Sequence, residues 1–168
     1  MGKSLFLTVI YAVCSLCYMA AQGLVNVKHY SVKDGMSQNT VQGVLQDNEG
    51  YIWMATWNGL EKFDGYSFKN YKTYPTDKVK LQYNRLVNLQ LGGNQMLVCQ
   101  SYDRRVYLFD IRRECFEDVF VYHPEVKLCT AASKIITLPN GMVWIVGTNG
   151  DLWRIDCFRY KDKGGLVY

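Results

Sequence analysis

The chain has 168 residues, 49% of them hydrophobic, which is enough to bury a sizeable core within one domain. Its formal net charge is +4, from 19 basic and 15 acidic residues, and the basic residues are scattered along the chain. Because nucleic-acid binders usually gather Lys and Arg on one face or stripe, composition and charge argue against that class.

The N-terminus carries the pattern of an export signal. Lys3 is followed by an uncharged, apolar run over residues 5–21, which ends in Ala20 and Ala21. A positive start, a short apolar stretch and small residues at its end are typical of a secretory signal peptide. We therefore expect residues 1–22 to be a signal peptide that directs export. The alternative is an uncleaved membrane anchor, because the run lies at the short end of the lengths that span a bilayer.

Removal of residues 1–22 would leave four cysteines, at positions Cys99, Cys115, Cys129 and Cys157. Four cysteines allow three full pairings, and the sequence does not choose between them and four free thiols buried on strands. No Cys-x-x-Cys pair remains among the four. We therefore expect no metal site and no cofactor.

Residues 41–71 have the pattern of four short strands joined by tight turns. The expected strands cover residues 41–46, 51–56, 60–63 and 66–71, and Asn58-Gly59 and Asp64-Gly65 supply hairpin turns between them. Residues 51–55 are apolar at consecutive positions, which predicts a strand covered on both faces. The last strand alternates in polarity and should lie further out. Such a meander is typical of a β-propeller blade.

The pattern repeats along the chain. Asp64, Asp110 and Asp156 each follow an apolar residue and lie 46 residues apart, close to the usual length of a propeller blade. The sequence therefore predicts an all-β fold: an incomplete β-propeller of about three four-stranded antiparallel blades, preceded by a signal-peptide helix. The expected blades cover residues 41–71, 84–121 and 133–160. Residues 23–40 form a leading strand and the loop into the first blade, and residues 161–168 begin a further blade.

The first repeat closely resembles that of two-component regulator propellers. The matching residues are Gly35-Met36-Ser37, Gln46-Asp47, Gly50, Trp53, Thr56, Gly59-Leu60 and Phe63-Asp64-Gly65. The third repeat matches at Gly141, Trp144, Gly147-Thr148 and Asn149-Gly150, whereas the second has lost the Trp and Gly-Thr and is assigned by spacing.

Proteins of this family form the periplasmic sensor half of hybrid two-component systems, known best from gut Bacteroidetes. Their plan is two seven-bladed propellers, an immunoglobulin-like domain, a membrane helix and a histidine kinase. The resemblance therefore implies an N-terminal fragment of a carbohydrate sensor anchored in the inner membrane. It also implies further blades and a dimer partner, with an oligosaccharide as the ligand. The sequence has no kinase motif, so we expect no catalysis in this chain.

Blade topology sorts the turns onto two faces. The turns at 57–58, 102–105 and 149–151 share one face with the links 34–40, 74–84 and 122–133; we name this the loop face. The turns at 47–50 and 64–65 lie on the opposite face. Because binding residues concentrate on loops held by a rigid scaffold, the loop face is the expected site.

The candidate ligand-binding residues of the loop face are Trp57, Asn58, Arg104, Arg105 and Asn149. Trp57 at a hairpin tip could stack on a sugar ring, and the arginines could bind a carboxylated or sulfated glycan through charge-assisted hydrogen bonds. The structural alternatives are that Trp57 only covers the blade end and that both arginines are solvated turn residues.

Two other functions fit a propeller: a secreted enzyme of the polysaccharide lyase or quinoprotein type, and a structural or protein-binding scaffold. An enzyme would need a cluster of His, Tyr or acidic residues on the loop face. His29 and His123 each lie beside a Tyr, without neighbours that suggest catalysis. The sequence therefore predicts no catalytic residues.

Overall fold

The computed structural model of the chain describes residues 2–3, 6–11, 26–77, 79, 81–93, 95–117, 131–160 and 166–167. Residues 2–3 and 6–11 are helical, and a short 3-10 helix, η1, covers Val32–Asp34. No helix in these ranges is long and apolar enough to cross a membrane. Most of the predicted signal peptide lies outside the described residues.

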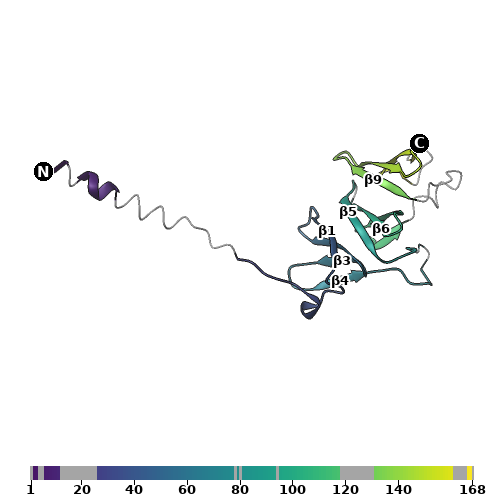
Figure 1. Ribbon diagram of the computed structural model, residues 1–168, viewed down its shortest axis with the longest axis horizontal. Coiled ribbons are helices and arrows are strands. Elements are labelled where there is room, and N and C mark those ends of the chain that lie inside the picture. Colours follow the sequence, from purple (N-terminus) through teal and green to yellow (C-terminus); the bar gives the residue numbers. More distant parts are fainter. Residues whose placement is uncertain are drawn as a thin grey trace.

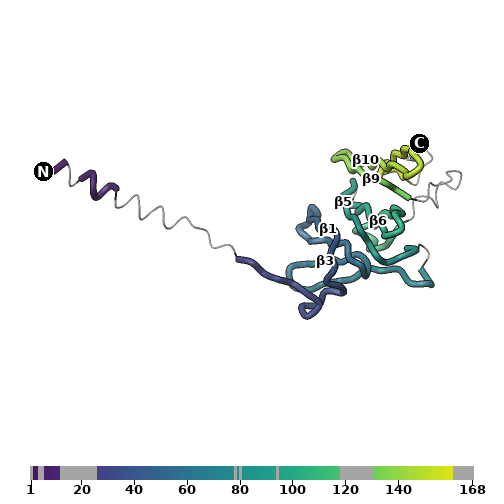
Figure 2. The backbone as a smooth tube through the Cα atoms, in the orientation of Figure 1, coloured from purple at the N-terminus to yellow at the C-terminus, as the bar shows by residue number. Residues whose placement is uncertain are grey.

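The described strands form three antiparallel four-stranded sheets, each in the order of the chain or its reverse (Figure 1). Their bounds are β1 Val41–Gln46, β2 Ile52–Thr56, β3 Gly59–Phe63, β4 Phe68–Tyr71, β5 Leu86–Leu91, β6 Met96–Ser101, β7 Val106–Asp110, β8 Cys115–Glu117, β9 Ala132–Thr137, β10 Met142–Gly147, β11 Leu152–Asp156 and β12 Leu166–Val167. The sheets follow one another side by side without closing a ring (Figure 2). The predicted fold, an incomplete propeller of three blades, is confirmed.

The last strand of the third sheet differs from the sequence interpretation. Residues 161–168 were expected to begin a further blade, but β12 pairs with β11, with Val167 opposite Arg154. β12 is thus the fourth strand of the third sheet. The reason lies in the turn before it, since Asp156 occupies the place that Asp64 and Asp110 occupy before the fourth strands of their own sheets.

The three regularly spaced aspartates shape the turn after the third strand of each blade. One carboxylate oxygen of Asp64 accepts the amides of Tyr66 (2.8 Å) and Ser67 (2.7 Å). Asp110 accepts the amides of the second and third residues after it in the same way, and Asp156 accepts the amide of the second. Hydrogen bonds from Ser67 and Tyr66 hold the pKa of Asp64 below its ordinary value. The repeated aspartate is therefore a turn-forming residue.

The core lies between neighbouring sheets. One apolar cluster joins the first and second sheets, and another joins the second and third. Trp53, Val98 and Trp144 occupy the same position in the second strand of their sheets, as the pairing registers show. Trp53 and Val98 are 0% and 1% exposed, whereas Trp144 is only half-buried. Within the described part of the chain, the side of the third sheet that would face a following blade is thus left open.

We expect this open side to make the purified full chain self-associate. Ile136, which lies opposite Trp144 on β9, is 41% exposed, and exposed apolar patches of this kind drive association in solution. Sedimentation velocity should show oligomers, and Ile136→Lys should shift them towards monomer. Tyr66→Lys, in a turn of the first sheet, is the control and should change nothing. A monodisperse monomer of the unmodified chain would contradict the expectation.

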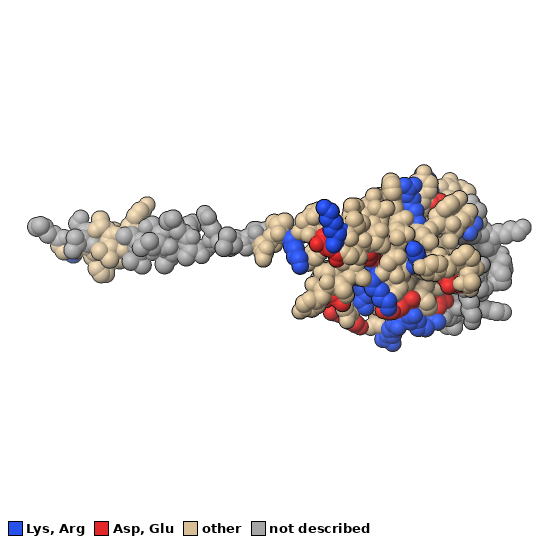
Figure 3. Space-filling view, turned by 90° about the horizontal axis from the view of Figure 1, so that it is seen from below, with Lys and Arg blue, Asp and Glu red and all other residues tan. Residues whose placement is uncertain are grey.

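Charged side chains connect the first two sheets as well. Glu114, in the turn between β7 and β8, accepts a hydrogen bond from the Tyr71 hydroxyl (2.7 Å) and forms ion pairs with Lys69 and Lys62 of the first sheet. On the described part of the face shown in Figure 3, basic and acidic side chains lie intermingled. The contacts of Glu114 with Tyr71, Lys69 and Lys62 hold the second sheet against the first at their outer strands.

Three of the four cysteines that would remain after removal of residues 1–22 are described, and two of them, Cys99 and Cys157, form no disulfide. Cys99 and Cys157 are buried, and burial raises the pKa of the Cys157 thiol to about 11. Cys129 lies outside the described residues, so the pairing question stays a prediction for that position. Because the thiolate is the reactive form, Cys157 is not expected to react readily at neutral pH.

Candidate ligand-binding face

The first hairpin of the loop face is built around Thr56, which is fully buried. Its hydroxyl accepts the amide of Asn58 (3.1 Å) and donates to the carbonyl of Gly59 (2.9 Å). Gly59 has a φ of 106°, and a Cβ there would lie 2.3 Å from a carbonyl oxygen of β4, so only glycine fits. The Asn70 side chain donates to the Asn58 carbonyl (2.9 Å). The turn is thus held from within, and the ring of Trp57 remains 42% exposed at its tip.

Each hairpin of the loop face is tied to the link that precedes its own sheet. The same backbone hydrogen bond recurs in all three sheets, from Trp57 to the carbonyl of Thr40 (3.3 Å), from Tyr102 to Arg85 (2.8 Å) and from Thr148 to Ala131 (3.0 Å). These bonds bring the hairpins and the described ends of the links together on one face, in agreement with the arrangement expected from blade topology.

Trp57 does not stand alone at its hairpin tip. The guanidinium carbon of Arg85 lies 3.4 Å from the centroid of the Trp57 ring and 4.9 Å from that of the Tyr102 ring. Trp57 belongs to the first sheet, whereas Arg85 and Tyr102 belong to the second, so the three residues meet where the two sheets join. Tyr102 is 62% exposed. We name this group the aromatic–arginine cluster.

Arg104 and Arg105 lie in the same hairpin as Tyr102, and both are exposed. Arg104 adopts a φ of 66°, and its carbonyl accepts the amide of Ala132 (2.9 Å), which ties the hairpin to the start of β9. Arg105 lies 3.7 Å from the carboxylate of Asp103, so part of its charge is already balanced. The structure therefore places both predicted arginines on the loop face, with different surroundings.

Asn58 and Asn149 have turn-forming roles in the structure. The backbone of Asn58 is fixed by Thr56 and Asn70, as described above. The side chain of Asn149 accepts the amide of Asp151 (3.1 Å) and donates to its carboxylate, so it stabilises the third hairpin. Among the described residues, no hydrogen bond or ring contact joins Asn149 to the aromatic–arginine cluster.

Sequence reasoning missed Arg85, although the signal was present. A positively charged residue directly before β5 lies at the same repeat position as Thr40 and Ala131, which carry no charge. Aligning the three repeats at this position would have singled out Arg85. Its stacking on Trp57 could not have been inferred, because that contact crosses from one blade to the next.

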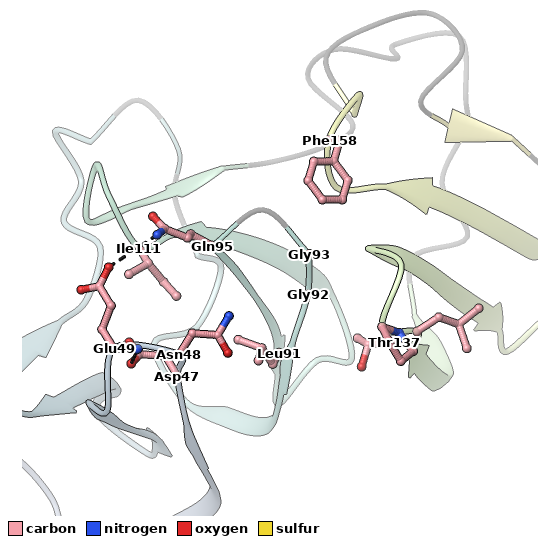
Figure 4. Close-up of a pocket in the computed structure, with 12 residues that line it drawn as sticks. Asp47, Asn48, Glu49, Leu91, Gly92, Gly93, Gln95, Ile111, Thr137 and Phe158 are labelled. Carbon is pink, nitrogen blue, oxygen red and sulfur yellow. Dashed lines mark hydrogen bonds between the residues drawn. The ribbon is translucent and has the colours of Figure 1, made fainter.

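A pocket of about 490 Å³ lies on the opposite face, where turns of all three sheets meet (Figure 4). It is lined by Asp47, Asn48, Glu49, Leu91, Gly92, Gly93, Gln95, Ile111, Thr137, Leu138, Pro139 and Phe158. Its carboxylates are engaged, since Asp47 accepts the indole N–H of Trp53 (2.7 Å) and Glu49 accepts the Gln95 amide (3.4 Å). Both carboxylates in this lining thus accept a hydrogen bond from a neighbouring side chain.

The described part of the chain holds no group of three or more His, Cys, Asp or Glu side chains that could bind a metal ion. His29 is exposed, and His123 lies outside the described residues. The described part of the loop face therefore offers stacking on aromatic rings and hydrogen bonding from guanidinium groups.

Comparison with solved structures supports the fold. Two structures of the extracellular domain of one B. thetaiotaomicron protein, described as a one-component system and as a hybrid two-component system, are similar to this chain. The TM-scores are 0.55 and 0.53 at 23% and 24% identity, over 79% and 73% of this chain. The chain spans only 16% and 15% of the two solved chains.

Comparison of sequences gives one curated relative at significant similarity, and no family model matches. The relative is Histidine kinase P4 of Formosa agariphila, which is 32% identical over 76 residues, or 45% of this chain and 6% of the relative. The resemblance to two-component regulator propellers that the first repeat predicts is therefore confirmed, in fold by these extracellular domains and in sequence by a histidine kinase.

Proposed function

We propose that the chain is the N-terminal part of a periplasmic, ligand-sensing propeller of a two-component sensor protein, and that its loop face binds an oligosaccharide. The observation that carries this proposal is the exposed ring of Trp57, held beside Arg85 and Tyr102 at the tip of a turn that the buried Thr56 fixes. Exposed aromatic rings provide flat apolar faces on which a sugar ring can pack.

The construction of the cluster supports a binding role. Binding sites work best when their side chains are held in place before the ligand arrives, because less conformational entropy is then lost. The Trp57 turn is fixed by Thr56, and the backbone of Tyr102 is fixed by its hydrogen bond to the carbonyl of Arg85. In this proposal the chain itself binds and does not catalyse, and signalling is carried out by a kinase in the rest of the protein, with further blades and a dimer partner.

Replacing Trp57 with alanine is expected to weaken oligosaccharide binding about tenfold, since truncating a central aromatic residue typically costs more than 1 kcal/mol of binding energy. Binding of the full chain to an oligosaccharide array, followed by titration of the sugars that bind, measures the change. Tyr66→Ala, in a turn on the opposite face, is the matched control and should bind like the unmodified chain. Unchanged binding in the Trp57 variant would remove this residue from the site.

A further inference from the structure

The side chain of Arg85 is not needed for the backbone geometry around it. The bond from the hairpin to the preceding link is made equally with Thr40 in the first sheet and Ala131 in the third. Neither of these side chains carries a charge, and one is a single methyl group. The fold of the blade therefore does not explain why position 85, in the second sheet, carries an arginine.

The guanidinium group of Arg85 lies over the rings of Trp57 and Tyr102. It stacks at 3.4 Å on Trp57 and lies 4.9 Å from the Tyr102 ring, and both rings remain partly exposed. Among the described residues, neither an acidic side chain nor any hydrogen-bond acceptor contacts the Arg85 guanidinium. An arginine stacked in this way presents N–H groups in the planar geometry that suits carboxylate and sulfate oxygens.

The acidic side chains described in the adjoining hairpin and link already have partners. Asp103 of the neighbouring hairpin pairs with Arg105 and accepts the Ser101 hydroxyl. Asp77 of the link into the second sheet accepts the amide of Tyr74 (2.7 Å). Among the described residues no carboxylate forms an ion pair with Arg85, so an incoming anion would meet its guanidinium without displacing an internal partner.

We propose that Arg85 binds a negatively charged group of the ligand, a carboxylate or a sulfate, at the junction of the first two blades. Trp57 and Tyr102 fix the plane of the guanidinium, and Trp57 packs on the sugar that carries the charged group. This deepens the proposed function, on which it rests, because it assigns the ligand to the acidic or sulfated oligosaccharides. The binding group is Arg85, a residue that the sequence did not suggest.

The competing explanation is that Arg85 only fastens the first sheet to the second. In that case Arg85→Gln should lower the melting temperature of the chain and leave binding of anions unchanged. The proposal expects the opposite result. Because Thr40 and Ala131 fill equivalent positions in the neighbouring repeats, the Arg85→Gln chain should fold and melt like the unmodified chain.

The first experiment presents the full chain to an array of neutral, carboxylated and sulfated oligosaccharides. Binding should be confined to the charged members, and comparison of carboxylated with sulfated sugars identifies which group is preferred. Arg85→Gln should weaken the binding about tenfold or more, as expected for loss of a charge-assisted hydrogen bond. Arg112→Gln, which removes an exposed arginine from the opposite face, is the matched control and should bind normally.

The second experiment needs no oligosaccharide. Sodium sulfate and sodium acetate are titrated at constant ionic strength against sodium chloride, and the Nε–H signal of Arg85 is followed by NMR. A shift specific to sulfate or acetate supports the proposal. Such a shift without binding of any oligosaccharide would contradict the proposed function and retain the anion site. Binding of neutral sugars alone would overturn the anion site and retain the proposed function. Equal responses to all three salts, with unchanged binding in Arg85→Gln, would also overturn the anion site.

Discussion

Replacing Trp53 with alanine is expected to lower the free energy of unfolding by about 3–5 kcal/mol, the usual cost of removing a large buried aromatic side chain. The Trp53 ring is 0% exposed and lies 5.7 Å from the ring of Tyr71 and 5.4 Å from that of Phe109. Since Phe109 belongs to the second sheet, the substitution opens a cavity between two blades. Urea unfolding followed by circular dichroism measures the loss.

A second cost follows from the hydrogen bond of the indole. Trp53 donates to one oxygen of Asp47, whose other oxygen accepts the amides of Glu49 and Tyr51 at 2.9 Å each. Without the indole, a buried carboxylate oxygen loses its partner, which adds to the cost. Trp53→Phe should therefore fall between alanine and the unmodified chain, because it keeps one aromatic ring but loses the donor and part of the buried volume.

Trp144→Ala is the matched control for this prediction. Trp144 occupies the same repeat position in the third sheet but is only half-buried, because the described chain places no further sheet against it. Its loss should cost clearly less than that of Trp53. Equal costs for the two substitutions would show that contact between blades contributes little, and that the stability of each blade is set within its own sheet.

The blades could be predicted well because turn chemistry is local. Asn58-Gly59 and Asp64-Gly65 specify tight hairpins within a few residues, and the aspartate of each repeat bonds to amides only two or three positions ahead. A signal of that kind is fully contained in the sequence. The assignment of β12 shows the limit of predicting from local signals. This strand was expected in a further blade, although Asp156 already marked the turn before a fourth strand.

The candidate site was predictable only in part, because it depends on contacts between blades. The exposed position of Trp57 follows from its place beside Asn58-Gly59, and the loop face follows from blade topology. The partner of Trp57 could not be predicted in this way, because Arg85 lies 28 positions away in the sequence and contacts Trp57 from the next sheet. Asn149 was selected by analogy with Asn58, but its side chain is occupied within its own turn.

Glu61 is an ionisable side chain buried in the first sheet, which the sequence did not reveal. It lies on β3 with Met54 and Asn70 as its cross-strand neighbours and is fully buried. One carboxylate oxygen accepts the amide of Ser37 at 2.6 Å, and the other has no hydrogen-bond partner among the described residues. Burial raises the pKa of Glu61 above its ordinary value, and the bond from Ser37 opposes the shift only in part.

Glu61→Gln is therefore expected to stabilise the chain at pH 7 by about 1–2 kcal/mol, because it removes a buried charge and keeps the acceptor for Ser37. The sign follows from linkage. A carboxyl whose pKa is higher in the folded state binds its proton more tightly there, so its ionisation costs stability as the pH rises above 4.5, the value of an unperturbed Glu. The advantage of the glutamine variant should thus grow between pH 4.5 and neutrality and nearly vanish in more acidic solution.

Urea unfolding of both proteins from pH 4 to pH 8 tests this, and taking the difference between them cancels the titration of every other group. A glutamine variant that is less stable at all pH values would mean that the carboxylate bond to Ser37 outweighs the burial of charge. The consequence reaches the loop face, because Asn70 donates both to the Ser37 hydroxyl (3.0 Å) and to the carbonyl of Asn58. Through these contacts Glu61 helps to position the turn that carries Trp57, so the charge of one buried residue should influence how firmly the candidate site is held.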